Sequence, residues 1–88
     1  MREIHFEWDE WNVDHIAQYD VEPDEVEEVF EHFHIIRKTR QGRRIAYGQT
    51  LDGRHLFVVF VYRNSRVYTI TARDMTRQEK RFYRRSRR

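Results

Sequence analysis

The sequence predicts an α+β fold, an antiparallel sheet with two N-terminal helices on one face and a C-terminal helix. β-Branched and aromatic residues are densest over residues 55–72, in alternating runs separated by turn residues. Helix-start signals occur twice before this region and once after it. Strands that cluster in sequence, with helices grouped before and after them, are typical of the α+β class. The expected order of elements is therefore β-α-α-β-β-β-β-α.

The N-terminal third is predicted to form a short strand and two helices. Apolar and polar side chains alternate over residues 2–8, as in a half-exposed strand. Asp9 can cap a first helix over about residues 10–19, and Pro23 starts a second helix that ends near His32. The residues expected to face inward are Trp11 or Asn12, His15, Ile16 and Tyr19 from the first helix, and Val26, Val29, Phe30 and Phe33 from the second.

Two turn signals divide the middle of the chain into strands. The dipeptides Asp52-Gly53 and Asn64-Ser65 predict two-residue hairpin turns, so the chain from residue 44 to about residue 72 forms a three-stranded meander. A further strand is expected at His34–Lys38. The predicted opposed pairs are Tyr47–Val58, Ile45–Phe60, Tyr62–Val67, Phe60–Thr69, Val58–Thr71 and Leu56–Arg73.

This register separates two faces of the meander. One carries large apolar residues beside small ones that let a helix approach closely, and we expect the helices there; it holds Phe57, Val59, Val61, Tyr68, Ile70, Ala46, Gly48 and Ala72. The other face becomes polar along its outer strand, at Thr69, Thr71 and Arg73, and is a candidate ligand surface. Simple exposure to solvent explains the two threonines at least as well.

The C-terminal segment predicts a basic helix. Thr76 and Glu79 have the spacing of a capping box, so a helix begins near Thr76. Its packing stripe is Met75, Glu79, Phe82 and Tyr83. The basic end, residues 84–88, is expected to fray.

Composition limits the kinds of protein that this chain can be. Its 88 residues are enough for one domain, spanning residues 1–88, and too few for two. There is no cysteine, and the histidines show no metal-ligand spacing, so we expect no disulfide, metal or cofactor. No apolar run approaches the ~18 residues of a membrane helix, and the first residues do not form a signal peptide. We therefore expect a soluble, cytoplasmic protein.

Charge is segregated along the chain. Residues 1–32 contain twelve acidic side chains and one arginine, whereas residues 33–88 contain sixteen Lys and Arg and three acidic side chains. A basic half of this density attracts nucleic-acid phosphates, and an acidic half repels them. Mutual neutralisation of the two halves, within the fold or across a homodimer, explains the pattern equally well.

Four segments of the chain resemble the BrnT toxin family. They are FEWDEWN at residues 6–12, VEPDEVEEVF at 21–30, DGRHLFVVF at 52–60 and TITARDMTRQEKRFY at 69–83. The last is the most specific, through Thr71, Ala72, Arg73, Thr76, Glu79 and Tyr83. The resemblance implies a RelE-like fold, metal-independent cleavage of RNA, inhibition of translation and a cognate antitoxin protein encoded nearby. One departure is Gln18-Tyr19-Asp20, where family members often carry Lys-His-Gly.

Metal-free RNA cleavage needs a base, a cation over the phosphate and an acid. Arg73 is the candidate cation, because a guanidinium can hold two phosphate oxygens. His55 and Tyr83 are the candidates for proton transfer, with Tyr62 and Arg63 in support. Ordinary structural roles compete with each: Arg73 can pair with Asp74 or Glu79, Tyr83 can pack against the sheet, and His55 falls on the helix-facing side of the predicted register.

The candidate RNA-binding residues are basic side chains of the last hairpin and the last helix. They are Arg63, Arg66, Arg77, Lys80, Arg81 and Arg84. The leading hypothesis is an RNA-cleaving toxin with RNA and an antitoxin as partners. The alternatives are an inactive nucleic-acid- or protein-binding module on the same fold, and a purely structural role in which the charges direct assembly.

Overall fold

The structure, a computed structural model, describes residues 3–87 and has the predicted order of elements. In chain order these are β1 (Phe6–Glu7), α1 (Glu10–Ala17), α2 (Pro23–Glu31), β2 (His34–Lys38), β3 (Arg44–Gln49), β4 (His55–Arg63), β5 (Arg66–Asp74) and α3 (Arg77–Ser86). The α+β prediction is confirmed. The expectations for Arg2 in the first strand and for Arg88 at the C-terminus lie outside the described residues.

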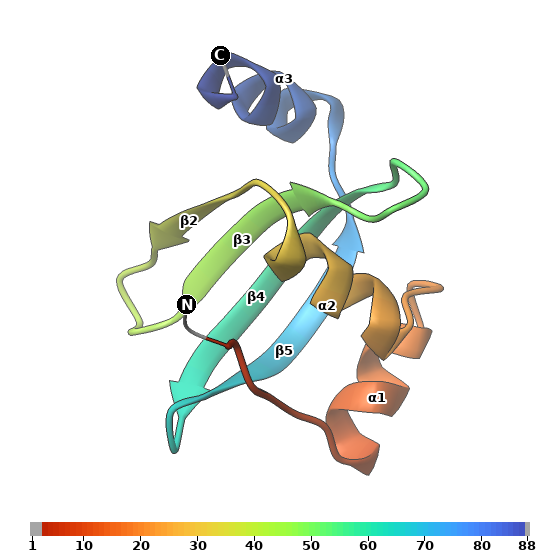
Figure 1. The fold of residues 1–88 in the computed structure, drawn as a ribbon, viewed down its shortest axis with the longest axis vertical. Coiled ribbons are helices and arrows are strands. Elements are labelled where there is room, and N and C mark those ends of the chain that lie inside the picture. The colour runs from red at the N-terminus through yellow and green to blue at the C-terminus, as the bar shows by residue number, and fades with distance from the viewer. Residues whose placement is uncertain (1–2, 88) are drawn as a thin grey trace.

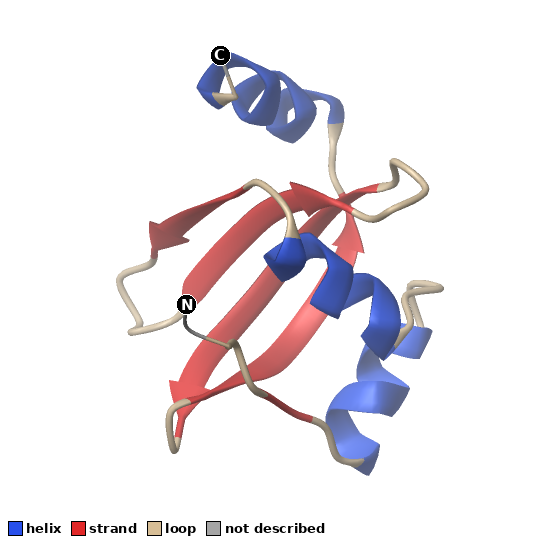
Figure 2. Ribbon diagram, in the orientation of Figure 1, coloured by secondary structure: helices blue, strands red, loops and turns tan. Residues whose placement is uncertain are grey.

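The strands form one five-stranded sheet in the order β1-β5-β4-β3-β2. Neighbours from β5 to β2 are antiparallel as predicted, but β1 pairs in parallel with β5, so the sheet is mixed. Helices α1 and α2 lie against one face of the sheet, and α3 lies beyond the end at which β5 finishes (Figure 1). Figure 2, in which helices, strands and loops have different colours, shows that a short linker joins α3 to the sheet. Within residues 3–87 no helix is both long and apolar enough to cross a membrane.

The main core lies between the two N-terminal helices and the sheet. Its fully or nearly fully buried side chains are Ile16, Val21, Val26, Val29, Phe30, Ala46, Leu56, Val58, Phe60, Val67 and Ala72. Gly48 allows α2 to approach closely, because a Cβ at this position would lie 2.8 Å from Cγ1 of Val29. The small residues of β3 and β5 do face these helices, as expected.

The loop of the β3–β4 hairpin is one residue longer than predicted. Its loop has three residues, Leu51–Gly53, because the amide of Thr50 donates to the carbonyl of Arg54 at 2.9 Å. Gly53 has a φ of +85°, the left-handed conformation that ends such a loop. The longer loop pairs Tyr47 with Phe57 and Ile45 with Val59, so the predicted Tyr47–Val58 and Ile45–Phe60 pairs are wrong.

The pairing of the β4–β5 hairpin matches the prediction only near its turn. Asn64 and Ser65 both have positive φ, as a tight two-residue turn requires, and Tyr62–Val67 and Phe60–Thr69 are paired as predicted. Beyond these pairs Ile70 is an extra residue in β5, a β-bulge. The bulge replaces the predicted Val58–Thr71 and Leu56–Arg73 pairs with Val58–Ala72 and Leu56–Asp74.

These corrections exchange the two faces of β4. The α1–α2 face carries Leu56, Val58 and Phe60, whereas we expected Phe57, Val59 and Val61 there. Phe57 and Tyr47 instead form the second cluster, with Met75 and Tyr83. We call this side of the sheet the α3 face. His55 and Arg73 also lie on the α3 face, because they alternate with residues buried under the helices.

The helix boundaries follow local capping signals. Asp9 and Thr76 each form a capping box, as the sequence predicted for Thr76. Helix α1 ends at Ala17, two residues earlier than expected, and its inward residues are Asn12 and Ile16. Of the alternatives Trp11 and Asn12, Asn12 is the inward residue and Trp11 is 55% exposed. The predicted inward positions Tyr19 and Phe33 are both 46% exposed.

Candidate functional site

Helix α3 is attached to the sheet mainly by aromatic side chains. Tyr83 is only 2% exposed and belongs to a cluster with Tyr47 and Met75, against which Phe82 packs. The rings of Tyr47 and Phe82 have centroids 5.0 Å apart in an edge-to-face arrangement. The predicted packing of Tyr83 with Phe82 against the sheet is therefore present, and it brings the basic helix next to the start of β4.

His55, the first residue of β4, lies against Tyr83, one of the aromatic residues that attach α3 to the sheet. Its ring meets that of Tyr83 edge-on, with centroids 5.7 Å apart. Burial lowers the pKa of His55 below its usual 6.5, and the positive charges of Lys80, Arg84 and Arg87 lower it further. The imidazole is therefore neutral at neutral pH and can accept a proton. The predicted register put His55 on the helix-facing side of the meander with Ala46 and Gly48, whereas in the structure it lies on the α3 face, opposite to α1 and α2.

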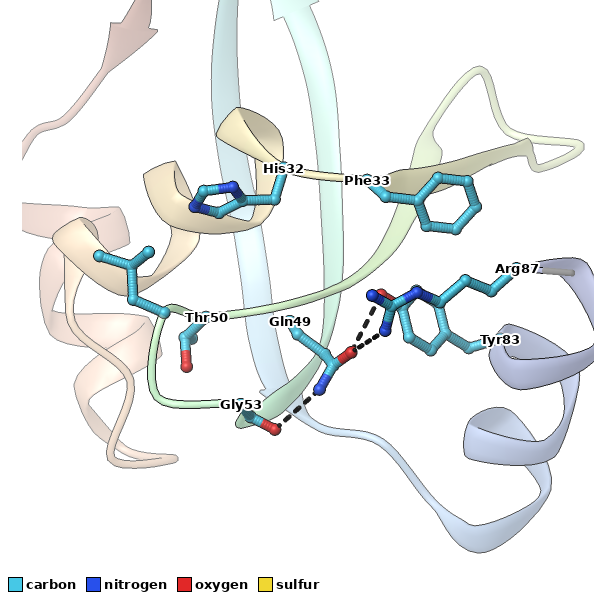
Figure 3. A pocket seen from close by; sticks show the side chains of 8 residues that line it. His32, Phe33, Gln49, Thr50, Gly53, Tyr83 and Arg87 are labelled. Carbon is cyan, nitrogen blue, oxygen red and sulfur yellow. Dashed lines mark hydrogen bonds between the residues drawn. The ribbon is translucent and has the colours of Figure 1, made fainter.

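A cleft of about 370 Å³ opens beside Tyr83 (Figure 3). It lies between the α2–β2 junction, the β3–β4 loop and α3, and its lining residues are His32, Phe33, Gln49, Thr50, Leu51, Gly53, Tyr83 and Arg87. Tyr83 therefore contacts His55 and also forms one wall of the cleft. Of the residues proposed from sequence for catalysis or RNA binding, only Tyr83 lines it.

Gln49 organises the polar part of the cleft. Its side-chain carbonyl oxygen accepts hydrogen bonds from the Tyr83 hydroxyl at 3.3 Å and from the Arg87 guanidinium at 2.8 Å. Its side-chain nitrogen donates to the carbonyl of Gly53 at 3.2 Å. Figure 3 shows these bonds converging on Gln49. The Tyr83 hydroxyl is thus already engaged as a donor, which suits a positioning role for this ring.

A protein-family model matches residues 8–79, and the family is described as the ribonuclease toxin, BrnT, of a type II toxin-antitoxin system. The chain belongs to the BrnT family. Membership of this family implies RNA as the substrate class and an antitoxin as the protein partner. The match ends in the first turn of α3, so Tyr83 and most of the basic residues of that helix lie beyond it. No curated protein and no solved structure matches the chain.

Arg73, in the segment that most resembles BrnT, is already paired with a carboxylate. Its guanidinium makes two hydrogen bonds to Glu79, at 2.8 and 3.0 Å, and a third to the carbonyl of Asp74. It also lies over the ring of Phe57, 4.0 Å from the centroid. The bond to Arg73 is the main cause of the lowered pKa of Glu79, so the pair remains ionised at neutral pH. Of the pairings left open by the sequence, the structure has the one with Glu79.

Three further candidates from the sequence lie away from His55. Arg63 binds Glu7 at 2.6 Å and lies over the ring of Tyr68, at the opposite end of β4. Tyr62 is 52% exposed and lies on the α1–α2 face, where Arg44 covers its ring. Arg66 is exposed in the same hairpin. The structure therefore brings His55 and Tyr83 together with Lys80, Arg84 and Arg87, and it joins Arg73 to the first turn of α3, but these three candidates lie elsewhere.

The basic residues of α3 differ in their pairing from three arginines of the sheet and its loops, Arg54, Arg63 and Arg73. These three arginines are each bonded to a carboxylate. By contrast, no ion pair within residues 3–87 involves any of the basic residues of α3 or its C-cap, which are Arg77, Lys80, Arg81, Arg84, Arg85 and Arg87. A positive charge that has no carboxylate partner is available for phosphate. No group of three His, Asp or Glu side chains in the described part of the chain can hold a metal ion.

The segment that departs from the BrnT pattern forms the turn between α1 and α2. Asp20, at the position where the resemblance implies a glycine, has a left-handed φ of 58°. Arg54 holds this turn by donating to the carbonyls of Tyr19 and Asp20, at 3.1 and 2.6 Å. It also binds the carboxylates of Glu25 and Asp74. The backbone therefore keeps a conformation suited to glycine although the side chains differ.

Every residue that lines the cleft except Tyr83 was missed in the prediction from sequence, and three of them matter most for its chemistry. Gln49, Arg87 and Phe33 come from β3, the C-terminal end of α3 and the α2–β2 junction, and they meet only in the folded chain. No local pattern marks Gln49 or Phe33. Arg87 carried a compositional signal only, as one arginine in a basic tail.

Proposed function

We propose that this chain is an endoribonuclease toxin that uses His55 as its general base, needs no metal ion and inhibits translation by cutting RNA. The observation that carries the proposal is the position of His55. It lies at the foot of a basic helix, against Tyr83, with its pKa lowered first by burial and then by Lys80 and its neighbours. A neutral imidazole among cations that lack carboxylate partners is suited to act on a phosphodiester.

The proposed chemistry is attack by the ribose 2′-hydroxyl. His55 accepts the proton of this hydroxyl, the 2′-oxygen bonds to phosphorus, and the bond from phosphorus to the 5′-oxygen breaks. The departing oxygen takes a proton from the ammonium group of Lys80, and the products carry a 2′,3′-cyclic phosphate and a 5′-hydroxyl. Arg84 stabilises the negative charge that develops on the phosphate oxygens. Tyr83 holds the imidazole in place.

The test is cleavage of a single-stranded RNA by His55→Gln, in the presence of EDTA. We expect a loss of ~100-fold or more, the contribution typical of a general base, and cyclic-phosphate ends in the wild-type product. His15→Gln is the control, because this histidine stacks on Trp11 in α1. Cleavage that stops in EDTA, or a His55→Gln variant as fast as the wild type, would contradict the proposal.

The second candidate is a module that binds RNA or protein without cutting. Two observations favour it: the absence of the Lys-His-Gly side chains at Gln18-Tyr19-Asp20, and the engagement of the Tyr83 hydroxyl by Gln49. In the same assay this candidate predicts RNA binding with intact RNA at every time point, for the wild type and both variants.

A further inference from the structure

The cleft beside Tyr83 has an apolar rim that the fold does not require. Phe33 is 46% exposed and Leu51 is 69% exposed, and both line the cleft. Phe33 contacts the buried ring of Tyr83, with centroids 6.0 Å apart and planes tilted by 49°. Figure 3 shows Phe33 above Tyr83 and Arg87, on the other side of the cleft from α3. The rim therefore presents one aromatic surface to whatever enters.

The polar groups of the cleft favour an anion. Its lining residues include no carboxylate, although Glu28 accepts a hydrogen bond from the amide of Leu51 at 3.0 Å, and its cation Arg87 bonds only to the Gln49 side chain among the side chains of residues 3–87. The volume of about 370 Å³ lies near the lower end of the roughly 300–1,000 Å³ found for small-molecule sites. An aromatic surface, a guanidinium without a carboxylate partner and a space of this size together fit one nucleotide.

The position of the cleft relates it to the proposed cleavage site. The ring of Tyr83 contacts His55 and Phe33, so the cleft and the general base share one wall. Arg87 lines the cleft and is also one of the charges that lower the pKa of His55. A nucleotide in the cleft would therefore have its phosphate close to the imidazole.

We propose that this cleft binds the nucleobase next to the scissile phosphate of a single-stranded RNA, with the base on Phe33 and its phosphate on Arg87. The inference rests on the proposed function for the identity of the substrate. Only an unpaired base can leave its neighbours and stack on a protein ring, so double-stranded RNA does not use the cleft.

The test is binding of a short single-stranded RNA with 2′-O-methyl riboses, which cannot be cut at the 2′-oxygen. One base is replaced by fluorescent 2-aminopurine, whose emission falls on stacking. We expect Phe33→Ala to weaken binding by ~5- to 150-fold, as the loss of one base–aromatic stack does, and to abolish the fluorescence change. Phe33→Tyr should restore both. The matched control is Ile36→Ala, which removes an apolar side chain of similar exposure, 41%, from another groove.

Several results would overturn the inference. Equal binding by Phe33→Ala and Ile36→Ala would show that the rim does not bind RNA and would assign it to a protein contact. Equally tight binding of a duplex would exclude a base in the cleft. Because the probe cannot be cut, the binding result is independent of catalysis. Phe33-dependent binding by a chain that never cuts RNA would refute the nuclease and keep the base site. RNA cleavage by a chain whose binding does not depend on Phe33 would refute the base site alone.

Discussion

Arg73 and Glu79 form a two-bond ion pair, with N···O distances of 2.8 and 3.0 Å, across the junction of β5 and α3. The same carboxylate accepts the backbone amide of Thr76 at 2.8 Å and so begins α3. The arginine that the sequence marked for phosphate binding therefore also supports the helix that carries the basic residues.

Replacing Arg73 by Ala should lower the free energy of unfolding by about 1–2 kcal/mol, because a half-buried carboxylate loses its partner. If Arg73 also contacts the phosphate, RNA cleavage and growth inhibition should fall by ~100-fold or more, and Arg73→Lys should restore only part. Urea unfolding and an RNA-integrity assay measure the two effects. Glu79→Gln is the control, since it removes the ion pair and leaves Arg73 in place. Equal losses of activity in Arg73→Ala and Glu79→Gln would show that Arg73 acts only through α3.

The pH dependence of cleavage should report the lowered pKa of His55. A general base works in its neutral form, so the rate should rise with pH to a midpoint below 6.5 and then stay level through neutrality. Arg84→Gln removes one of the charges that lower this pKa and should move the midpoint upward. Rates of the two proteins between about pH 5 and 8 provide the comparison. A midpoint that does not move would show that Arg84 does not act on His55.

Salt should weaken RNA binding mainly through α3. Arg81 has no ion-pair partner within residues 3–87, whereas Arg63 is already bonded to Glu7. Arg81→Ala should therefore reduce the slope of log affinity against log salt by ~0.7, the value for one phosphate contact to a single strand. Arg63→Ala should leave the slope unchanged. A larger reduction of the salt slope by Arg63→Ala than by Arg81→Ala would place the RNA on the β4–β5 hairpin, at the other end of the sheet.

Asp20→Gly should stabilise the fold by up to about 1 kcal/mol, because glycine adopts the left-handed backbone without strain and this gain exceeds its entropic cost. Asp14→Gly, in the middle of α1, is the matched control and should destabilise by about 1 kcal/mol. Thermal melts of both variants decide the question. A loss of stability in Asp20→Gly would mean that the aspartate side chain itself holds the turn.

The sequence predicted the order of elements because caps and turns are local. Asp9, Pro23 and the Thr76–Glu79 box each act within one helical turn, and all three begin helices as expected. The faces of the sheet could not be predicted equally well. One extra residue in the loop before Arg54 and one bulge at Ile70 each move every later side chain to the opposite face.

The candidate site was predicted in part for the same reason. Arg73, Tyr83 and the basic residues of α3 belong to one segment, so the sequence grouped them correctly with one another. Their contacts with His55 and Gln49 depend on how α3 folds back on the sheet, through aromatic packing between distant segments. Such packing has no local signature.

Arg54 binds four separate places in the chain: the carbonyls of Tyr19 and Asp20, and the carboxylates of Glu25 and Asp74. The turn after α1, the start of α2 and the end of β5 therefore cannot open one at a time without breaking bonds to the same guanidinium. We expect these segments to unfold in a single cooperative step, with amide hydrogens that share one free energy of opening. A protease would then find no separately opening helical arm to cut, and the lifetime of the chain in a cell would be set by its global stability.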